Sequence, residues 1–301
     1  MEYHQPVLLQ ESVEGLKIKP DGVYVDATFG GGGHSGKILK LLNKGKLIGF
    51  DQDADALDNI PDDKRFIFVN HNFRFLKNFL KYYGFESIDG LIADLGISSH
   101  HIDTPQRGFS FRFDTNLDMR MNSSADFSAK ELLNTYSLDQ LTNVFRHFGE
   151  INNARHLALK IVDARNVNPI VSVNDLMTSI QECLPKKNEN HYLAKVFQAL
   201  RIEVNKEIEN LKEMLEQAAE MLKPGGRIVI ISYHSLEDRV VKNFFKTGNF
   251  KNEVKTDFYG NVERPLRPVN NKVIVPDAEE LIRNNRGRSA RLRIAEKINN
   301  N

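Results

Sequence analysis

The sequence predicts an α/β protein in which a parallel sheet is interrupted by an inserted helical domain. Short apolar strands alternate with helical segments from residue 22 to residue 96, the alternation then stops, and it resumes after residue 205. Strands of a parallel sheet are covered by helices on both faces and therefore appear as continuous apolar runs. We place the discontinuous sheet domain at residues 1–104 and 206–301 and the helical domain at residues 105–205.

Four strands are expected before the insertion, each a short run rich in apolar, β-branched or aromatic side chains. They are residues 23–28, 46–51, 65–70 and 88–96. Helical segments are expected after the first three strands, at residues 37–42, 54–57 and 73–83. In the last of these, apolar side chains recur at the spacing of an amphipathic helix, so one face should pack on the sheet.

The insertion and the second half of the sheet have distinct patterns. Within the insertion we expect helices at residues 129–136, 138–147, 151–165 and 173–183. After it we expect a helix at 208–222 that stops at Pro224-Gly-Gly226, a buried strand at 227–234, a helix at 238–245 and a last strand at 292–298. Residues 251–275 have no regular pattern.

The composition narrows the classes of protein that fit the chain. The 301 residues have a formal net charge of +1, so no global basic field marks a nucleic-acid-binding protein. Cys183 is the single cysteine, which excludes an intrachain disulfide and indicates a reducing compartment. The first residues do not form a secretory signal, and no apolar run approaches the roughly 20 residues that span a bilayer. We therefore expect a cytoplasmic protein.

A glycine-rich turn, Gly30 to Gly33, joins the first strand to a helix. Such a turn lets the backbone approach a ligand closely, and its free N–H groups favour a polar or anionic one. Asp51 ends the second strand, where a carboxylate binds the ribose of a nucleotide, although it could also cap a helix. The loop leaves two cofactors open. Its glycines at 31, 33 and 36 fit a dinucleotide frame, whereas the S-adenosylmethionine frame that begins at Asp26 has Thr28 in place of its first glycine.

The segment after the insertion favours the second cofactor, because the helix at 208–222, its stop and the strand at 227–232 look like the closing half of a class I methyltransferase sheet. Together with ordered motifs along nearly the whole chain, they make the sequence similar to the MraW family (also called RsmH) of bacterial small-subunit ribosomal RNA cytosine-N4 methyltransferases. The motifs are residues 26–35, 50–53, 94–99, 106–111, 117–121, 196–205, 232–239 and 285–296.

The resemblance implies a class I S-adenosylmethionine-dependent methyltransferase (Rossmann-like) sheet with an inserted helical domain for substrate recognition. It implies transfer of a methyl group from S-adenosylmethionine to the exocyclic N4 of a cytidine in 16S ribosomal RNA, with the small ribosomal subunit as partner and no metal. The implied cofactor contacts are Gly32, Gly33, His34, Asp51, Phe73, Asp94 and His101. His101 stands where the family has glutamine. Phe73 could instead be a core residue, and His34 an exposed residue of a first helical turn.

The residues that would bind the methyl-accepting amine are less defined than those that would bind the cofactor. An exocyclic amine is a weak nucleophile whose lone pair must be localised by a hydrogen-bond acceptor, so such an acceptor is expected in the site. Many amino-methyltransferases use an Asn/Asp-Pro-Pro-aromatic tetrad after the fourth strand, but this chain has Asp94-Leu-Gly-Ile-Ser-Ser99 there. The candidate catalytic residues are Asp94, Ser98 and His234. Ser98 could equally be a turn residue, and His234 a residue that merely ends a strand.

Two arginine-rich segments are candidates for RNA binding, because arginine pairs with phosphates and aromatic rings stack on unpaired bases. The candidates are Arg107, Arg112 and Arg120, interleaved with phenylalanines, and Arg286, Arg288 and Arg291 in the tail, with Arg283 and Arg293 beside them. The near-zero net charge favours an assembled subunit over free RNA as substrate, and a homodimer is possible. Two alternatives stay open: an NAD-type oxidoreductase, and a non-catalytic ribosome assembly factor that retains the fold.

Overall fold

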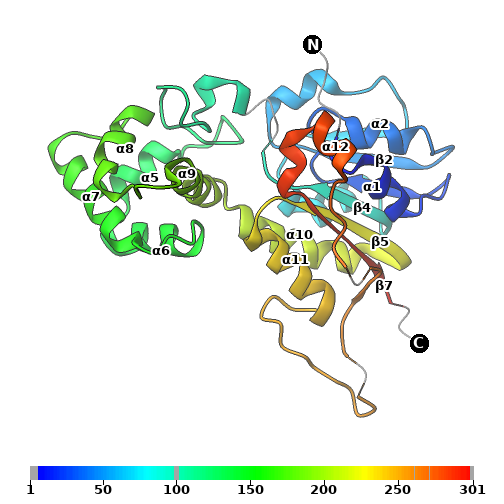
Figure 1. The fold of residues 1–301 in the computed structure, drawn as a ribbon. Helices are drawn as coiled ribbons and strands as arrows, with labels where there is room; N and C mark the ends of the chain where they lie inside the picture. Colours follow the sequence, from blue (N-terminus) through cyan, green and yellow to red (C-terminus); the bar gives the residue numbers. More distant parts are fainter. Residues whose placement is uncertain (1–5, 98–101, 261, 271, 299–301) are drawn as a thin grey trace. The chain divides into compact units, whose positions relative to one another are not determined.

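The computed structural model describes residues 6–97, 102–260, 262–270 and 272–298, and it divides the chain into two compact units (Figure 1). The sheet unit comprises residues 1–96 and 208–301, and the helical unit comprises residues 97–207. The helical unit is thus wider at both ends than the predicted 105–205. No helix among the described residues combines the length and apolar character needed to cross a membrane.

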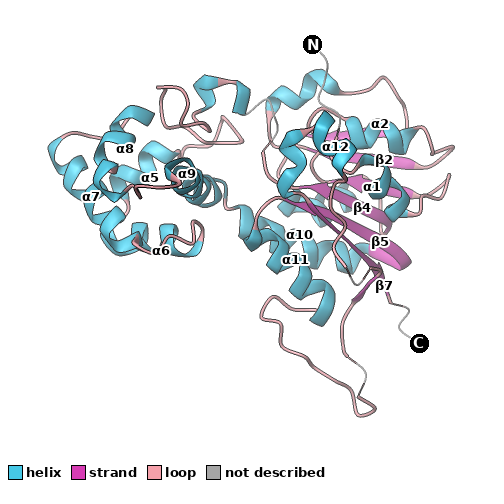
Figure 2. Ribbon diagram, in the orientation of Figure 1, coloured by secondary structure: helices cyan, strands magenta, loops and turns pink. Residues whose placement is uncertain are grey.

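The sheet has seven strands in the order β3-β2-β1-β4-β5-β7-β6 (Figure 2). Their bounds are β1 Val23–Asp26, β2 Lys46–Phe50, β3 Phe66–Val69, β4 Ile88–Asp94, β5 Leu222–Ser232, β6 Leu266–Pro268 and β7 Arg291–Lys297. Strands β1 to β5 pair in parallel as expected. The sheet as a whole is mixed, because β7 runs antiparallel to both β5 and β6. A strand pattern gives the period of a segment but not its direction, so this reversal was not predicted.

Successive residues of a strand point to opposite faces of the sheet, so apolar strands have side chains to bury on both faces. Helices cover both faces. One apolar core lies between the sheet and helices α3, α10 and α11. A second apolar core lies between the sheet and helices α1 and α2. The bounds in this unit are α1 Leu9–Leu16, α2 Gly33–Leu39, η1 Ala54–Asn59, η2 Phe73–Phe75, α3 Leu76–Tyr82, α10 Glu207–Met221, α11 Ser235–Thr247, α12 Ala278–Arg283 and η5 Asn285–Ser289. Helix α1 was not predicted, and the segment after β2 is a 3-10 helix. Helix α10 ends before Pro224, as expected.

The helical unit has its own apolar core. Its elements are η3 Pro105–Arg107, α5 Ala129–Thr135, α6 Leu138–His147, α7 Ala154–Val167, α8 Val173–Ser179, η4 Gln181–Cys183 and α9 Glu189–Asn205. Ser128, Ser137 and Ser172 start α5, α6 and α8 with reciprocal capping boxes, which satisfy backbone N–H groups that the first turn leaves unpaired. Helix α9 was missed, although its apolar residues Val196, Phe197 and Leu200 belong to the core of this unit.

Candidate active site

Three carboxylates lie at one edge of the sheet. Asp26 ends β1, Asp94 ends β4, and Asp51 directly follows β2. These strands are neighbours and run in parallel, with Asp26 level with Gly49 of β2 and Ile92 of β4. The carboxyl ends of parallel strands are where open α/β sheets bind their ligands. The fold therefore concentrates negative charge at the place where a ligand is expected.

Asp26 is buried, and both of its carboxylate oxygens hold the glycine-rich loop. Oδ1 accepts a hydrogen bond from Thr28 N at 3.1 Å, and Oδ2 accepts one from Ser35 Oγ in α2 at 2.7 Å. Burial raises the pKa of Asp26 to about 6, although these hydrogen bonds oppose the rise. The carboxyl group thus fixes the turn between β1 and α2.

Gly32 and Gly33 meet two different constraints. Gly32 precedes α2 with φ +73°, a conformation that side chains with a Cβ rarely adopt. At Gly33 a Cβ atom would lie 2.1 Å from Pro6 Cγ. Any larger residue at position 33 would therefore displace the N-terminal segment from the loop.

Asp51 joins the glycine-rich loop to the loop after β2. Its Oδ2 accepts from Gly30 N at 2.8 Å, and its Oδ1 accepts from Asp53 N at 2.9 Å. The side chain that caps the following 3-10 helix is that of Asp53, which accepts from Asp55 N. The helix-cap alternative for Asp51 is therefore wrong, and its carboxylate is oriented toward the loop predicted to hold the cofactor.

His34 is buried in the first turn of α2, so the alternative of an exposed histidine is wrong. Its Nδ1 lies 4.0 Å from Asp94 Oδ2, and its Nε2 has no hydrogen-bond partner among the described residues. Burial lowers the pKa of His34 to about 4. The imidazole is therefore neutral at physiological pH.

Asp94 is held from two directions. Its backbone N–H donates to Thr28 Oγ1 at 2.6 Å, and its Oδ1 accepts from the hydroxyl of Tyr233 at 2.8 Å. Thr28, which departs from the S-adenosylmethionine frame, thus ties the β1 loop to the end of β4. Burial raises the pKa of Asp94 to about 7, the negative charges of Asp26 and Glu237 add to the rise, and the Tyr233 hydrogen bond opposes it.

Tyr233 was missed by the sequence analysis. Its sequence signals are its position directly after β5, the strand beside β4, and its place within the motif at residues 232–239. His234, the next residue, caps α11: its Nδ1 accepts from Glu237 N at 3.4 Å, and its Nε2 lies 3.2 Å from Glu237 Oε1. The structure therefore gives His234 a local role in starting a helix, and its catalytic role stays a prediction.

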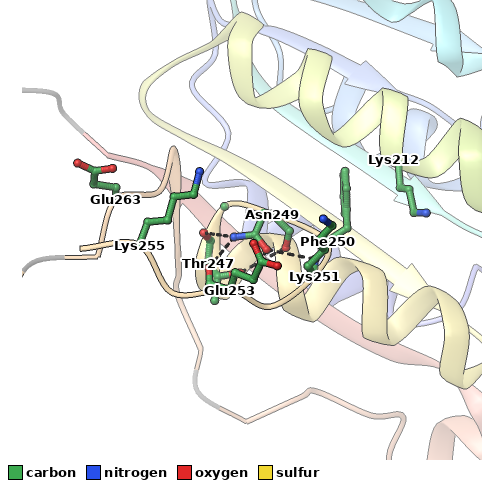
Figure 3. A pocket seen from close by; sticks show the side chains of 9 residues that line it. Lys212, Thr247, Asn249, Phe250, Lys251, Glu253, Lys255 and Glu263 are labelled. Atoms are coloured by element: carbon green, nitrogen blue, oxygen red, sulfur yellow. Dashed lines mark hydrogen bonds between the residues drawn. The ribbon is translucent and has the colours of Figure 1, made fainter. Parts of the chain in front are cut away.

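The remaining predicted contacts are less defined. Phe73 begins the 3-10 helix η2 and packs, partly buried, against the core of the sheet unit. Ser98 and His101 lie outside the described residues. A pocket of about 620 Å³ lies elsewhere, on residues of α10, α11 and the loop that follows α11 (Figure 3). None of the predicted site residues lines it.

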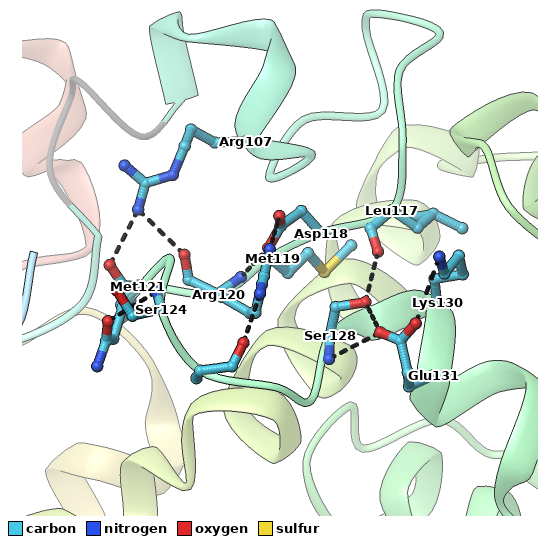
Figure 4. A network of polar contacts seen from close by, with 12 residues as sticks. Arg107, Leu117, Asp118, Met119, Arg120, Met121, Ser124, Ser128, Lys130 and Glu131 are labelled. Atoms are coloured by element: carbon cyan, nitrogen blue, oxygen red, sulfur yellow. Dashed lines mark hydrogen bonds and ion pairs between the residues drawn. The ribbon is translucent and has the colours of Figure 1, made fainter.

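The predicted RNA-binding arginines differ in their ion pairs and in their exposure to solvent. Arg107 donates to the carbonyls of Arg120 and Met121, and Arg120 forms a two-point ion pair with Asp118 (Figure 4). These guanidinium groups stabilise the loop before α5. Arg291 pairs with Asp238 at 3.1 Å, as does Arg293 at 2.6 Å. The exposed members of the set are Arg112, Arg283, Arg286, Arg288 and Arg291, of which Arg283 also pairs with Glu279 at 3.5 Å.

The strand order, the antiparallel β7, the glycine-rich loop after β1 and the carboxylate after β2 define a class I S-adenosylmethionine-dependent methyltransferase sheet, here with a helical insertion. More narrowly, the chain belongs to the MraW methylase family, whose model matches residues 1–298.

Proteins named ribosomal RNA small subunit methyltransferase H are similar over their full length. The Bacteroides thetaiotaomicron protein is 57% identical over 298 residues, which cover 99% of this chain and 98% of that protein. The Flavobacterium johnsoniae protein is 55% identical over 299 residues, covering 99% of both. This membership excludes the oxidoreductase alternative that the glycines at 31, 33 and 36 had left open.

We predict that Asp94→Asn stabilises the protein at pH 8 but much less at pH 5. A carboxyl group with a raised pKa contributes most stability when protonated, and this contribution is lost as pH rises through about 7. Asparagine removes the charge and can still accept from Tyr233. The gain in unfolding free energy should grow by on the order of 2 kcal/mol between the two pH values.

Denaturant unfolding at both pH values measures this difference. Asp58→Asn, which neutralises an exposed carboxylate in η1, is the matched control and should show no such growth. An equal gain for Asp94→Asn at pH 5 and pH 8 would contradict the raised pKa.

Proposed function

We propose that the protein transfers a methyl group from S-adenosylmethionine to the exocyclic N4 of a cytidine in 16S ribosomal RNA. The observation that carries this proposal is full-length membership of the MraW methylase family, with 57% identity to a ribosomal RNA small subunit methyltransferase H. The residues of the site support it, because they suit both a nucleoside cofactor and a weakly nucleophilic amine.

The residues at the carboxyl edge of the sheet fit S-adenosylmethionine. The Nε2 atom of His34 is buried without a partner, which costs free energy unless a ligand supplies one. Asp51 is the carboxylate that we assign to the ribose hydroxyls. The loop at Gly32, Gly33 and His34 and the end of β4 at Asp94 would hold the rest of the cofactor, with Phe73 near the adenine. His101 stays a further proposed contact.

The bound cofactor would supply an electrophilic methyl carbon, and the protein must then orient the amine and accept its proton. Asp94 suits this role, because a carboxyl group with a pKa of about 7 exchanges protons readily at neutral pH. Tyr233 occupies Oδ1 and leaves Oδ2 to face the amine. The imidazole of His34 lies beside Oδ2 but is neutral, so it does not occupy this oxygen by forming an ion pair in place of the amine. Ser98 and His234 stay secondary candidates for the same task.

The small ribosomal subunit is the partner that we propose, rather than free RNA. The net charge of +1 gives no general attraction to phosphates, so binding must come from local contacts and a structured target. The exposed arginines Arg112, Arg286, Arg288 and Arg291 remain candidates for such contacts. A homodimer stays a prediction.

The direct test is transfer of a labelled methyl group to small ribosomal subunits lacking the modification, followed by nucleoside analysis. We expect N4-methylcytidine as the product and a much faster reaction with subunits than with naked 16S ribosomal RNA. Another methylated nucleoside would refute the N4 assignment, and equal rates on both substrates would refute the preference for the subunit. No transfer to either substrate would favour the non-catalytic assembly factor.

We predict that Asp51→Ala weakens binding of S-adenosylhomocysteine by roughly 10- to 100-fold, because hydrogen bonds to a charged group contribute about 1.5–3 kcal/mol. Isothermal titration calorimetry measures this, with Asp58→Asn as a control that should stay within about twofold of wild type. Unfolding curves should accompany it, since Asp51 also holds two backbone N–H groups. Unchanged affinity in a folded variant would remove the ribose assignment.

The pH dependence of kcat/KM tests the role of Asp94. Because the carboxylate form is the acceptor, kcat/KM should rise with pH and level off above a midpoint near 7. Tyr233→Phe removes a hydrogen bond that stabilises this carboxylate, so its midpoint should move toward higher pH by about one pH unit. If the phenol only supports the fold, the rate would drop with no change of midpoint.

A further inference from the structure

The described residues of the loop that follows α11 form a hairpin that projects from the sheet unit (Figure 1). Thr256 and Val262 form an antiparallel bridge, and Glu263 N donates to Lys255 O at 2.9 Å. The turn closes through Gly260 N and Asp257 O at 3.0 Å, with Gly260 at φ +85°. Residues 255–260 and 262–263, called the finger below, therefore form a hairpin held by backbone hydrogen bonds, although their sequence showed no pattern.

Two aromatic side chains lie at the turn of the finger with almost their whole surface in solvent. Phe258 is 98% exposed and Tyr259 is 86% exposed, and their ring centroids are 5.6 Å apart at 87°. The side chain of Asp257 accepts from Tyr259 N at 2.9 Å and so helps fix the turn that presents them. Single exposed aromatics are common, but two adjacent rings fixed at a turn present a larger apolar surface to a partner than one ring does.

The pocket noted above lies at the base of the finger (Figure 3). Its wall is shaped by Asn249, which accepts from the N–H groups of Lys251 and Glu253 and donates to the carbonyls of Thr247 and Glu253. Phe250 stacks on Phe244 with centroids 5.0 Å apart. The pocket thus has a fixed backbone and an aromatic surface.

Three lysines and two glutamates line this pocket: Lys212, Lys251 and Lys255, with Glu253 and Glu263. The Nζ atom of Lys212 lies 5.8 Å from the centre of the Phe250 ring. Segment 242–264 holds five basic and three acidic residues, a net charge of +2 where the whole chain has +1. The segment around the finger thus carries a small net positive charge, which complements a polyanion.

We propose that the finger and its basal lysines form an RNA-docking surface, on which Phe258 and Tyr259 stack with unpaired bases and Lys251 and Lys255 bind phosphates. Aromatic rings that stack on splayed-out bases, next to cations that follow the backbone, are the usual means of binding single-stranded RNA. This inference rests on the proposed function, because it names a second contact with the same ribosomal RNA, outside the carboxyl edge of the sheet.

The test is the double variant Phe258→Ala/Tyr259→Ala, assayed for methyl transfer to small subunits. Base stacking contributes about 1–3 kcal/mol per base, so KM for the subunit should rise tenfold or more while kcat changes little. Binding of S-adenosylhomocysteine should stay as in wild type. The matched control is Tyr82→Ala/Tyr83→Ala, an exposed, edge-to-face aromatic pair at the end of α3, whose removal should leave KM unchanged.

Lys251→Gln/Lys255→Gln tests the charged part of the surface. Its KM should rise at low salt and depend less on salt concentration than that of wild type, because each lost phosphate contact reduces the salt dependence. An unchanged KM in both double variants, with active wild type, would overturn the finger proposal alone. If wild type transfers no methyl group, the proposed activity fails, and co-sedimentation of the same variants with small subunits still tests the finger.

Photo-crosslinking from position 258 identifies the class of partner. Crosslinks to ribosomal RNA would support the proposal. Crosslinks confined to ribosomal protein, or flotation with anionic phosphatidylserine vesicles that the aromatic double variant loses, would overturn it.

Discussion

The site depends on one constraint: carboxylates at the edge of an apolar sheet must be given hydrogen-bond donors or become protonated. Each of the three acids meets this constraint differently. Asp26 is given Thr28 N and Ser35 Oγ, Asp51 is given two loop N–H groups, and Asp94 is given one phenol. The first two order the loop. Asp94 keeps an unusually high pKa and the capacity to exchange a proton near neutral pH.

The positions of the strands could be predicted because β1 to β5 are apolar runs whose burial leaves little alternative to a parallel sheet. The antiparallel direction of β7 could not be predicted, because the pattern of apolar and polar residues along a strand does not show which way the strand runs in the sheet. Helix α9, which is 17 residues long, was missed: Asn188 precedes it in a left-handed conformation and makes no side-chain cap, so no capping box marks its start.

The candidate site was predictable to the same extent. Asp51 and Asp94 follow apolar strands, and that position alone singles them out. The donor to Asp94 was not predictable, because Tyr233 is 139 residues away in the chain and reaches it only through the pairing of β4 with β5. Likewise, only coordinates could show that Asp53, and not Asp51, caps the 3-10 helix.

The pairing of β4 with β5 also has a consequence for how the protein matures. The helical unit is inserted between these two strands, so it must be synthesised before β5 can pair with β4. Bringing the ends of so long a segment together costs less conformational entropy once the segment is compact. During synthesis, Asp94 therefore leaves the ribosome early, and Tyr233, its hydrogen-bond partner, leaves it late. The hydrogen bond between Tyr233 and Asp94, which opposes the rise in the pKa of Asp94, therefore forms only after β5 has been synthesised and has joined the sheet.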